Sequence, residues 1–548
     1  FVPLMNETVF NIRKHFQVPL GAGGVTYPAS GLPIASKYLI NEYARLGIDF
    51  SFLRRTFIRD HAQYSMEHMI HHIRESYERA ANRSQEEIAA DFQSFREQVE
   101  GWVESRPGLR YTPVLSEPLP EDDWRGRTGW VHEALAADYD WQADKGKTVN
   151  LLLNKHPYTD AMIANLDTFK NMTGMDVKYD VFPEDVYFDK VGAALSSGSD
   201  QYDAFMTGAY QTWQYGPAGW IVDLNEFISD AAKTSPNYNW DDVLPNLRAS
   251  TSWSGVPFAP LGGDGAKQWA IPWGFELNSI SYNRKYFDDL KIELAKDLPS
   301  LVDQAAKISA AGKGYYGIGV RGSRSWATIH PGYLSAFANY GAADFAVQGG
   351  KGRAAMNSAA GKEMTKLWVK MIQEAGPKNW ATYTWYQVGT DLGAGASAMI
   401  YDADILGYFM NGGDNKEKGN IAYSAFTAKP GAAAPTPNVW IWSLAMANAS
   451  KQKEAAWKFM QWASGTEHGL FGAQKMDFVN PVRASVWKDE TFRARIDKSY
   501  PGYLAQFDAS APGSKIYFTP QPLFEAVTTE WAASLQKMVE IGRASCRE

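Results

Sequence analysis

The chain has 548 residues, of which 45% are hydrophobic and 21% charged, and its formal net charge at pH 7 is -7. This length is enough for two or three domains, each with a core of its own. The negative charge argues against nucleic acid as a partner, because binding to phosphates depends on clustered Lys and Arg. The sequence also lacks an apolar run of eighteen or more residues, so we expect no membrane span.

Aromatic residues are abundant, and cysteine is nearly absent. The twenty Trp suit a sugar site, because flat rings stack on the C–H faces of sugars, although core packing explains many of them equally well. Cys546 is the one cysteine, which excludes an intramolecular disulfide and a cysteine-based metal site. We predict neither a metal site nor a cofactor. Residues 540–548 resemble a translated sequencing adapter, and we exclude them from the fold.

Residues 1–102 form a mostly helical segment of unknown role. No basic start followed by an apolar core and a cleavage site is visible, so we expect no signal peptide here. Residues from about 53 to 102 are typical of two helices, and the first carries the histidines His61, His68, His71 and His72. His68 and His72 share a helix face, as metal ligands can, but no matching ligand set is evident. A surface or packing role is the alternative.

Residues 103–143 have a different character. Leu109 to Ser116, followed by Trp124 to His132, resembles part of the NAD-binding domain of ferredoxin-reductase-like flavoproteins. The flavin strand, the nucleotide loop and the downstream cysteine motif of that family are missing. A hydride-transfer enzyme must hold flavin against nicotinamide, and this fragment would hold neither. We therefore interpret it as a partial fragment in a chimeric open reading frame, with a vestigial reductase fusion as the alternative.

From residue 145 onward the pattern is regular α/β. Apolar strands are expected at 148–153, 177–181 and 202–206, and the helix after the first strand is expected to end at Gly174. Strand-helix-strand units of this length predict parallel pairing with right-handed crossovers. A binding crevice should then lie at the carboxyl ends of the strands.

Several later motifs occur in a recognisable order. These are a Gly/Pro-rich loop with a short apolar strand and a helix start at 255–287, a small-residue strand at 395–402, an aromatic strand at 438–445 and a helix at 451–462. In this order they resemble the family 1 extracellular solute-binding proteins of ABC importers, over about residues 145–539. The resemblance implies an α/β fold of the type II periplasmic-binding-protein class, preceded by the helical extension.

The resemblance also implies two lobes that close over a ligand. The solute-binding domain spans residues 144–539. Lobe one takes about 145–254 and 438–485, and lobe two about 270–430 and 490–539. We expect hinges near 255–270, 428–438 and 480–487, the first two because Gly and Pro cluster there.

Candidate ligand-binding residues follow from position and chemistry. Some end predicted strands, some flank the crossovers, and all are aromatic rings or hydrogen-bonding groups suited to sugar hydroxyls. The set is Lys155, His156, Tyr210, Trp213, Trp273, Glu276, Arg321, Trp326, Asp402, Trp440, Trp442 and Arg483. For each of them, packing within or between the lobes is the competing interpretation.

We therefore predict the substrate-binding component of an ABC importer for a sugar, oligosaccharide or polyol. The expected partners are that ligand and the permease subunits, the protein acting as a monomer in the periplasm or outside the cell. No catalytic residues are expected. A glycosidase is the main alternative, because Glu276 and Asp402 could pair as its two carboxylates.

Overall fold

The computed structural model describes residues 114–115, 127–128, 139–476, 480–500 and 502–540. The chain divides into two compact units, Phe1–Asp138 and Tyr139–Glu548. The described part of the first unit is a parallel pair of short strands, β1 (Val114–Leu115) and β2 (Arg127–Thr128). The helices predicted between 53 and 102, their histidines and the tail after Glu540 lie outside the described residues.

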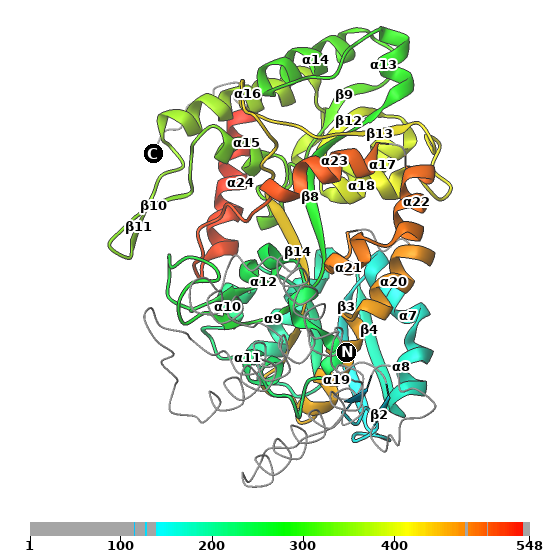
Figure 1. Ribbon diagram of the computed structural model, residues 1–548. Helices are drawn as coiled ribbons and strands as arrows, with labels where there is room; N and C mark the ends of the chain where they lie inside the picture. The colour runs from blue at the N-terminus through cyan, green and yellow to red at the C-terminus, as the bar shows by residue number, and fades with distance from the viewer. Residues whose placement is uncertain (1–113, 116–126, 129–138, 477–479, 501, 541–548) are drawn as a thin grey trace, which may run out of the picture. The chain divides into compact units, whose positions relative to one another are not determined.

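The second unit is organised around one mixed sheet of eight strands (Figure 1). Seven of them follow the order β4-β3-β5-β14-β8-β12-β9, and β13 pairs with β8. The bounds are β3 (Thr148–Asn154), β4 (Asp176–Phe182), β5 (Ala204–Gly208), β8 (Ile271–Asn283), β9 (Tyr316–Gly319), β12 (Ser397–Ala403), β13 (Ile421–Ser424) and β14 (Val439–Met446). Two small antiparallel pairs accompany the sheet, β6 (Ser252–Trp253) with β7 (Lys267–Gln268) and β10 (Phe345–Gln348) with β11 (Lys351–Ala354).

The first lobe contains β3, β4, β5 and the first half of β8. β3 pairs in parallel with both β4 and β5, which confirms the predicted strand-helix-strand pattern. The helices on this side are α7 (Pro157–Ala164), α8 (Leu166–Thr173), α9 (Glu184–Ser196), α10 (Thr212–Tyr215), α11 (Asn225–Ile228), α12 (Pro245–Ser250), α19 (Lys453–Ala463), α20 (Thr466–Lys475) and α21 (Ala484–Trp487). The helix predicted before Gly174 is interrupted at Asn165, and it ends as expected because Gly174 adopts a left-handed conformation, φ 66°.

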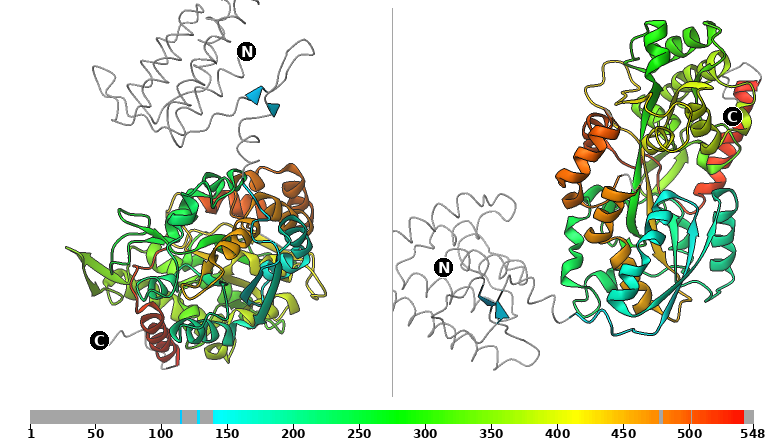
Figure 2. Two further views of the ribbon diagram at one scale, coloured as in Figure 1. Left: turned by 90° about the horizontal axis from the view of Figure 1, so that it is seen from below. Right: turned by 90° about the vertical axis from the view of Figure 1, so that its right-hand side faces the viewer.

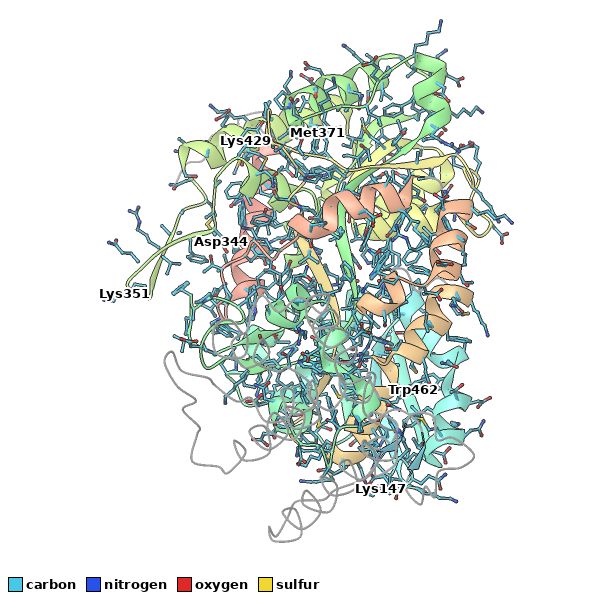
Figure 3. The ribbon with its side chains drawn as sticks, in the orientation of Figure 1. Lys147, Asp344, Lys351, Met371, Lys429 and Trp462 are labelled. Carbon is cyan, nitrogen blue, oxygen red and sulfur yellow. The ribbon has the colours of Figure 1, made fainter. Side chains whose placement is uncertain are left out.

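The second lobe contains β9, β12, β13 and the second half of β8. Its helices are α13 (Arg284–Leu290), α14 (Leu298–Ala310), α15 (Tyr333–Asn339), α16 (Ala359–Ala375), α17 (Trp385–Ala394), α18 (Asp404–Met410), α22 (Glu490–Ser499), α23 (Tyr503–Ser510) and α24 (Phe524–Glu540). The right-hand view of Figure 2 shows the two lobes one above the other, with long strands running between them. In Figure 3, Trp462 lies in one lobe and Met371 in the other.

The strand β8 joins the lobes. We expected a short strand here, and the prediction was wrong, because β8 has 13 residues and nearly all of them are buried. Residues up to Leu277 pair with β14, whereas residues from Asn278 pair with β12 and β13. The exchange of partners therefore falls inside a strand rather than in the Gly/Pro-rich loop at 255–270. That loop connects β6 and β7, and its Phe258 N–H donates to the Pro520 carbonyl at 2.7 Å.

The described residues include no helix long and apolar enough to cross a membrane. Buried apolar side chains form two clusters, one around β3, β5, α19 and also α14, α15 and α16, and the other around α18, α22 and α23. Both clusters contain buried residues of β8 and β14, so these two strands tie the lobes to a shared core.

Candidate functional site

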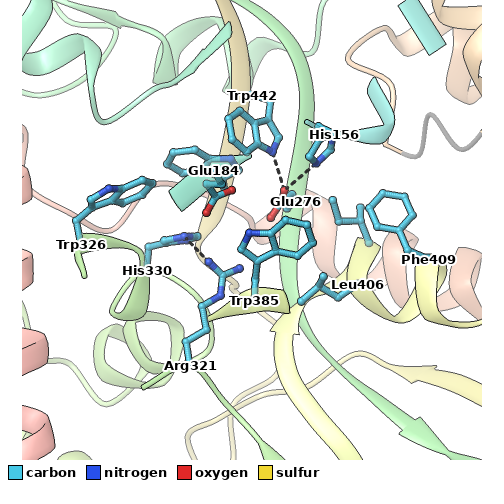
Figure 4. Close-up of a pocket in the computed structure, with 12 residues that line it drawn as sticks. His156, Glu184, Glu276, Arg321, Trp326, His330, Trp385, Leu406, Phe409 and Trp442 are labelled. Atoms are coloured by element: carbon cyan, nitrogen blue, oxygen red, sulfur yellow. Dashed lines mark hydrogen bonds and ion pairs between the residues drawn. The ribbon is translucent and has the colours of Figure 1, made fainter. Parts of the chain in front are cut away.

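A pocket, which we call the chamber, lies where the two lobes face each other (Figure 4). Its walls come from the ends of strands β3, β4 and β9, from the crossing strands β8 and β14, and from helices α17 and α18. The lining residues are His156, Glu184, Glu276, Arg321, Trp326, His330, Trp385, Ile405, Leu406, Phe409, Trp440 and Trp442. The cavity volume of the chamber is about 20 Å³, and its empty volume with open solvent included is about 380 Å³.

Glu276 is the carboxylate on the crossing strand β8. Its Oε1 accepts a hydrogen bond from the Trp442 Nε1–H at 2.8 Å, and the side chain is buried. β8 and β14 are antiparallel neighbours here, which sets these two side chains near each other. Burial raises the pKa of Glu276 to about 8, against the lowering effect of the nearby Arg321 charge. The Glu276 carboxyl group therefore titrates close to neutral pH.

Glu184 brings a second carboxyl group to the chamber. It is the first residue of α9, directly after β4 and Pro183, so the carboxyl end of a parallel strand positions it. Burial raises the pKa of Glu184 to about 7, again opposed by the Arg321 charge. Two carboxyl groups with raised pKa values can both donate and accept hydrogen bonds, as a polyhydroxylated ligand requires.

Arg321 is the buried cation of the chamber. Its Nε and Nη2 donate to the two oxygens of Asp402 at 2.9 and 2.7 Å, a bidentate pair. Asp402 is fully buried at the end of β12, behind Arg321 as seen from the chamber lining. The guanidinium Nη1 also donates to the Ala327 carbonyl at 3.3 Å. These contacts fix the plane of the guanidinium and compensate its charge.

Two histidines have tautomers that the structure determines. His156 caps α7 by accepting from the Tyr158 N–H through Nδ1, so the proton of the neutral ring is on Nε2, 3.9 Å from Glu276 Oε1. His330 Nε2 lies 3.3 Å from Arg321 Nη1, which can only donate, so its proton is on Nδ1. Burial lowers the pKa of His156 to about 3, and burial with the Arg321 charge lowers that of His330. Both rings are therefore neutral donors, and His330 Nδ1 has no hydrogen-bond partner among the described residues.

The aromatic lining is stacked largely on itself. The ring of Trp326 lies 5.3 Å from that of Trp440 at an interplanar angle of 27°, and His330 stacks on Trp440 at 5.1 Å and 28°. Trp440 and Trp442 meet edge to face at 5.1 Å. Because the ring faces already cover one another, these indoles form a rigid wall more than an open stacking platform.

Six predicted residues meet in the chamber lining: His156, Glu276, Arg321, Trp326, Trp440 and Trp442. Asp402 holds Arg321 without lining the chamber. Six lining residues were missed: Glu184, His330, Trp385, Ile405, Leu406 and Phe409. Glu184 could have been predicted from the sequence, because it follows the second predicted strand in the same way that His156 follows the first. The others depend on how α17, α18 and the segment after β9 pack, which the local pattern does not determine.

Two predicted charged residues lie elsewhere. Lys155 is exposed and pairs with Asp160 at 2.9 Å, because the strand end turns its side chain toward α7 rather than into the chamber. Arg483 is buried away from the chamber, where Nε donates to the Ser464 carbonyl at 2.7 Å and Nη1 to the Tyr238 carbonyl at 2.6 Å.

Three predicted aromatic residues are core residues and do not line the chamber. Tyr210 and Trp213 lie against each other at 5.3 Å, and the Tyr210 hydroxyl donates to the Val439 carbonyl at 2.9 Å. The Trp273 Nε1–H donates to the Ala463 carbonyl at the end of α19, at 2.9 Å. Trp273 lies within β8 and contacts α19 of the first lobe, whereas Tyr210 and Trp213 pack against Phe524 of α24, between the lobes.

Comparison with known proteins then identifies the family. Residues 155–469 match the model of the bacterial extracellular solute-binding proteins. This chain belongs to that family. A relative, the erythritol/L-threitol-binding protein of Mycolicibacterium smegmatis, is 40% identical over 415 residues, 75% of this chain and 86% of the relative. A solved solute-binding protein from Agrobacterium vitis S4, with bound D-mannitol, is similar in structure, with a TM-score of 0.60 and 21% sequence identity. The match covers 72% of this chain and 94% of the Agrobacterium vitis chain.

As a member of this family, the chain is a bacterial extracellular solute-binding protein. Its fold is that of the type II periplasmic-binding proteins, as the sequence resemblance implied. The carboxylates Glu276 and Asp402, considered above as a glycosidase pair, have different environments, because Asp402 is bound by Arg321 on both oxygens.

A separate relative matches over a short stretch only. The chain is 54% identical over 44 residues to the phenol hydroxylase P5 protein of Acinetobacter pittii, which is 8% of this chain and 12% of that protein. A match of this length carries no activity with it, and the assignment of residues 103–143 stays a prediction. Among the described residues, no group of three His, Cys, Asp or Glu side chains is placed to hold a metal ion.

Proposed function

We propose that this solute-binding protein captures a short acyclic polyol of the tetritol class in the chamber. The observation that carries the proposal is the meeting of Glu184, Glu276 and Arg321 inside a small indole-walled space. Each hydroxyl of a polyol is both a donor and an acceptor. The two carboxyl groups and the N–H groups of Arg321, His156 and His330 offer complementary partners.

The wall geometry favours a chain over a sugar ring. A pyranose stacks best on an indole whose face is open, whereas Trp326 and Trp440 are covered by each other and by His330. A flexible polyol needs hydrogen-bonding partners along its length and only apolar contact at its C–H groups. The relative that binds erythritol and L-threitol supports the same ligand class.

Calorimetric titration of the purified full chain tests this proposal. Erythritol and L-threitol should bind saturably at micromolar concentrations, and both should be recovered unchanged. D-mannitol, maltose and glycerol complete the panel. Saturable binding of maltose with no response to either tetritol would overturn the ligand assignment.

Glu276→Ala is the variant that tests the site. Loss of a buried partner for ligand hydroxyls should weaken tetritol binding by at least about 100-fold, since unpaired polar groups then remain in the complex. The matched control is Glu530→Ala, because Glu530 is exposed on α24 and outside the chamber lining. Its affinity should stay within about twofold of the wild type. Equal affinities for both variants would remove Glu276 from the site.

We further propose that the protein acts as a monomer in the periplasm or at the outer cell surface and delivers its ligand to permease subunits. The family is one of extracellular proteins, which supports this location. Light scattering of the purified chain, with and without erythritol, tests the monomer, and a dimeric mass would contradict it.

A further inference from the structure

A second hollow, the outer cleft, adjoins the chamber. The two share Glu184, Arg321, Trp326 and Trp385, so they meet along one edge. The outer cleft is far larger, with a cavity volume of about 860 Å³ against about 20 Å³ for the chamber. It opens between α9 of the first lobe and α17 and α24 of the second. A ligand longer than the chamber would have to extend into this space.

One aromatic contact stands at the shared edge and joins the lobes. Phe188 of α9 meets Trp326 edge to face at 5.2 Å and 87°. Phe188 lines the outer cleft but not the chamber, whereas Trp326 lines both. Phe188 also lies 6.1 Å from Trp442, nearly parallel at 17°, and Trp442 lines the chamber. The Phe188 ring therefore separates a chamber wall from the outer cleft.

Both rings are held in place by their surroundings. Next to Phe188, the Tyr187 hydroxyl lies 2.8 Å from the Leu152 carbonyl oxygen and 2.5 Å from that of Met206, which anchors α9 to the sheet. Trp326 begins a short 3₁₀ turn (Trp326–Thr328), and the Ser325 hydroxyl caps it by accepting from the Ala327 N–H at 3.2 Å. The Trp326 ring is also stacked on Trp440. A barrier made of anchored rings does not yield easily to a longer ligand.

We propose that the contact between Phe188 and Trp326 is a specificity barrier that limits the length of the bound polyol. It closes the chamber toward the outer cleft once the lobes meet, so that a chain longer than a tetritol cannot extend into the outer cleft. The proposal rests on the proposed function and deepens it, because it names the residues that select among polyols. Phe188 acts by excluding space and needs no contact with a tetritol.

Titration of Phe188→Ala with erythritol, ribitol, D-mannitol and maltose tests the barrier. Removing the ring should join the chamber to the outer cleft, so the ratio of D-mannitol to erythritol affinity should rise by at least about tenfold. Phe188→Leu keeps much of the bulk and should change the ratio less. Phe471→Ala is the matched control, because Phe471 lies on α20 and lines neither hollow. An unchanged ratio in a folded Phe188→Ala protein would overturn the barrier.

A second measurement needs no polyol and separates this proposal from the proposed function. Leu406 lines the chamber, and Cys546 is the one cysteine of the chain. In a Cys546→Ser background, Leu406→Cys should react slowly with a bulky thiol reagent and faster with a small one. Adding Phe188→Ala should raise the rate for the bulky reagent at least about fivefold while the small-reagent rate changes little. Equal rates for the bulky reagent with and without Phe188 would overturn the barrier, whatever the ligand. A wild type that binds no polyol would overturn only the proposed function.

Discussion

Glu276 shows how one buried side chain couples stability to pH. Its pKa is raised to about 8 in the folded protein, above the ordinary value of 4.5 expected in the unfolded chain. Between these values the folded state holds a proton that the unfolded state has released, so stability falls as pH rises. His156 and His330 have the opposite effect on stability. Both are neutral in the folded protein but protonated in the unfolded chain below about pH 6.5, so in that range their effect is that stability rises with pH.

We therefore expect the ligand-free protein to lose stability between pH 6.5 and 8. The slope for one proton is at most about 1.4 kcal/mol per pH unit, and Glu184 adds to it up to its pKa of about 7. Urea unfolding at several pH values measures this, and Glu276→Gln should flatten the dependence. Glu530→Gln is the control, because its carboxylate is exposed and pairs with Arg324. A slope unchanged in Glu276→Gln would contradict the assignment.

A second prediction at the residue scale concerns the contribution of the Arg321–Asp402 pair to stability. Asp402→Asn would leave the guanidinium buried without its charge partner, which should cost about 3–5 kcal/mol of unfolding free energy. Asp508→Asn breaks an exposed pair with Arg493 and should cost no more than about 1 kcal/mol. Urea midpoints followed by circular dichroism compare the two variants. Similar losses for both would mean that the buried pair is not structurally important.

At the scale of elements, β8 is the strand on which both lobes depend. It exchanges pairing partners at Leu277 and keeps almost every side chain buried. Such a strand needs room where other elements cross it. Gly274 supplies that room, because a Cβ built there would lie 1.9 Å from the ring of Tyr158, whose hydroxyl donates to the Phe275 carbonyl at 3.3 Å.

Gly274→Ala should consequently lower the unfolding free energy by about 1–3 kcal/mol through overpacking. Gly192→Ala is the matched control within α9, where a Cβ would meet nothing within 4 Å. That change should be neutral or stabilise by up to about 1 kcal/mol, because alanine favours the helix. Thermal and urea unfolding measure the stability of both variants. A Gly274→Ala protein as stable as the wild type would contradict the expected overpacking at this position.

At the scale of the whole molecule, the second unit has its own boundary contacts. Asp144 accepts from Lys458 Nζ at 2.5 Å, in a pair where both side chains are nearly buried, and the Tyr139 hydroxyl accepts from Gln461 Nε2 at 2.9 Å. Both contacts connect the start of the unit to α19. The unit therefore begins at about Tyr139.

A chain that starts at Tyr139 should fold and bind erythritol within about twofold of the full chain. A chain that starts at Lys147 loses Asp144 and should be less stable, because Lys458 is then buried without its partner. Thermal unfolding with and without erythritol measures both effects, since ligand at 100 times its dissociation constant adds about 2.7 kcal/mol. Failure of the Tyr139 chain to fold would place the boundary earlier.

The sequence by itself determined several of the elements and their order. Strands β3, β4 and β5, the end of α8 at Gly174 and the position of β14 follow from apolar periodicity and turn residues, which act over a few neighbours. Parallel pairing then brought His156 to a strand end facing the other lobe. The order of motifs was enough to identify the family.

Only the tertiary structure decided which side chains form the chamber. Tyr210 and Trp213 turned toward Phe524 of α24 and Trp273 turned toward α19, while Glu184 and Trp385 turned toward the chamber. Side-chain direction at a loop or strand end depends on which distant segment fills the space beside it, and the chain's local pattern carries no record of that segment. The bidentate contact of Arg321 with Asp402 joins residues 81 positions apart, so it exists only once the second lobe has packed.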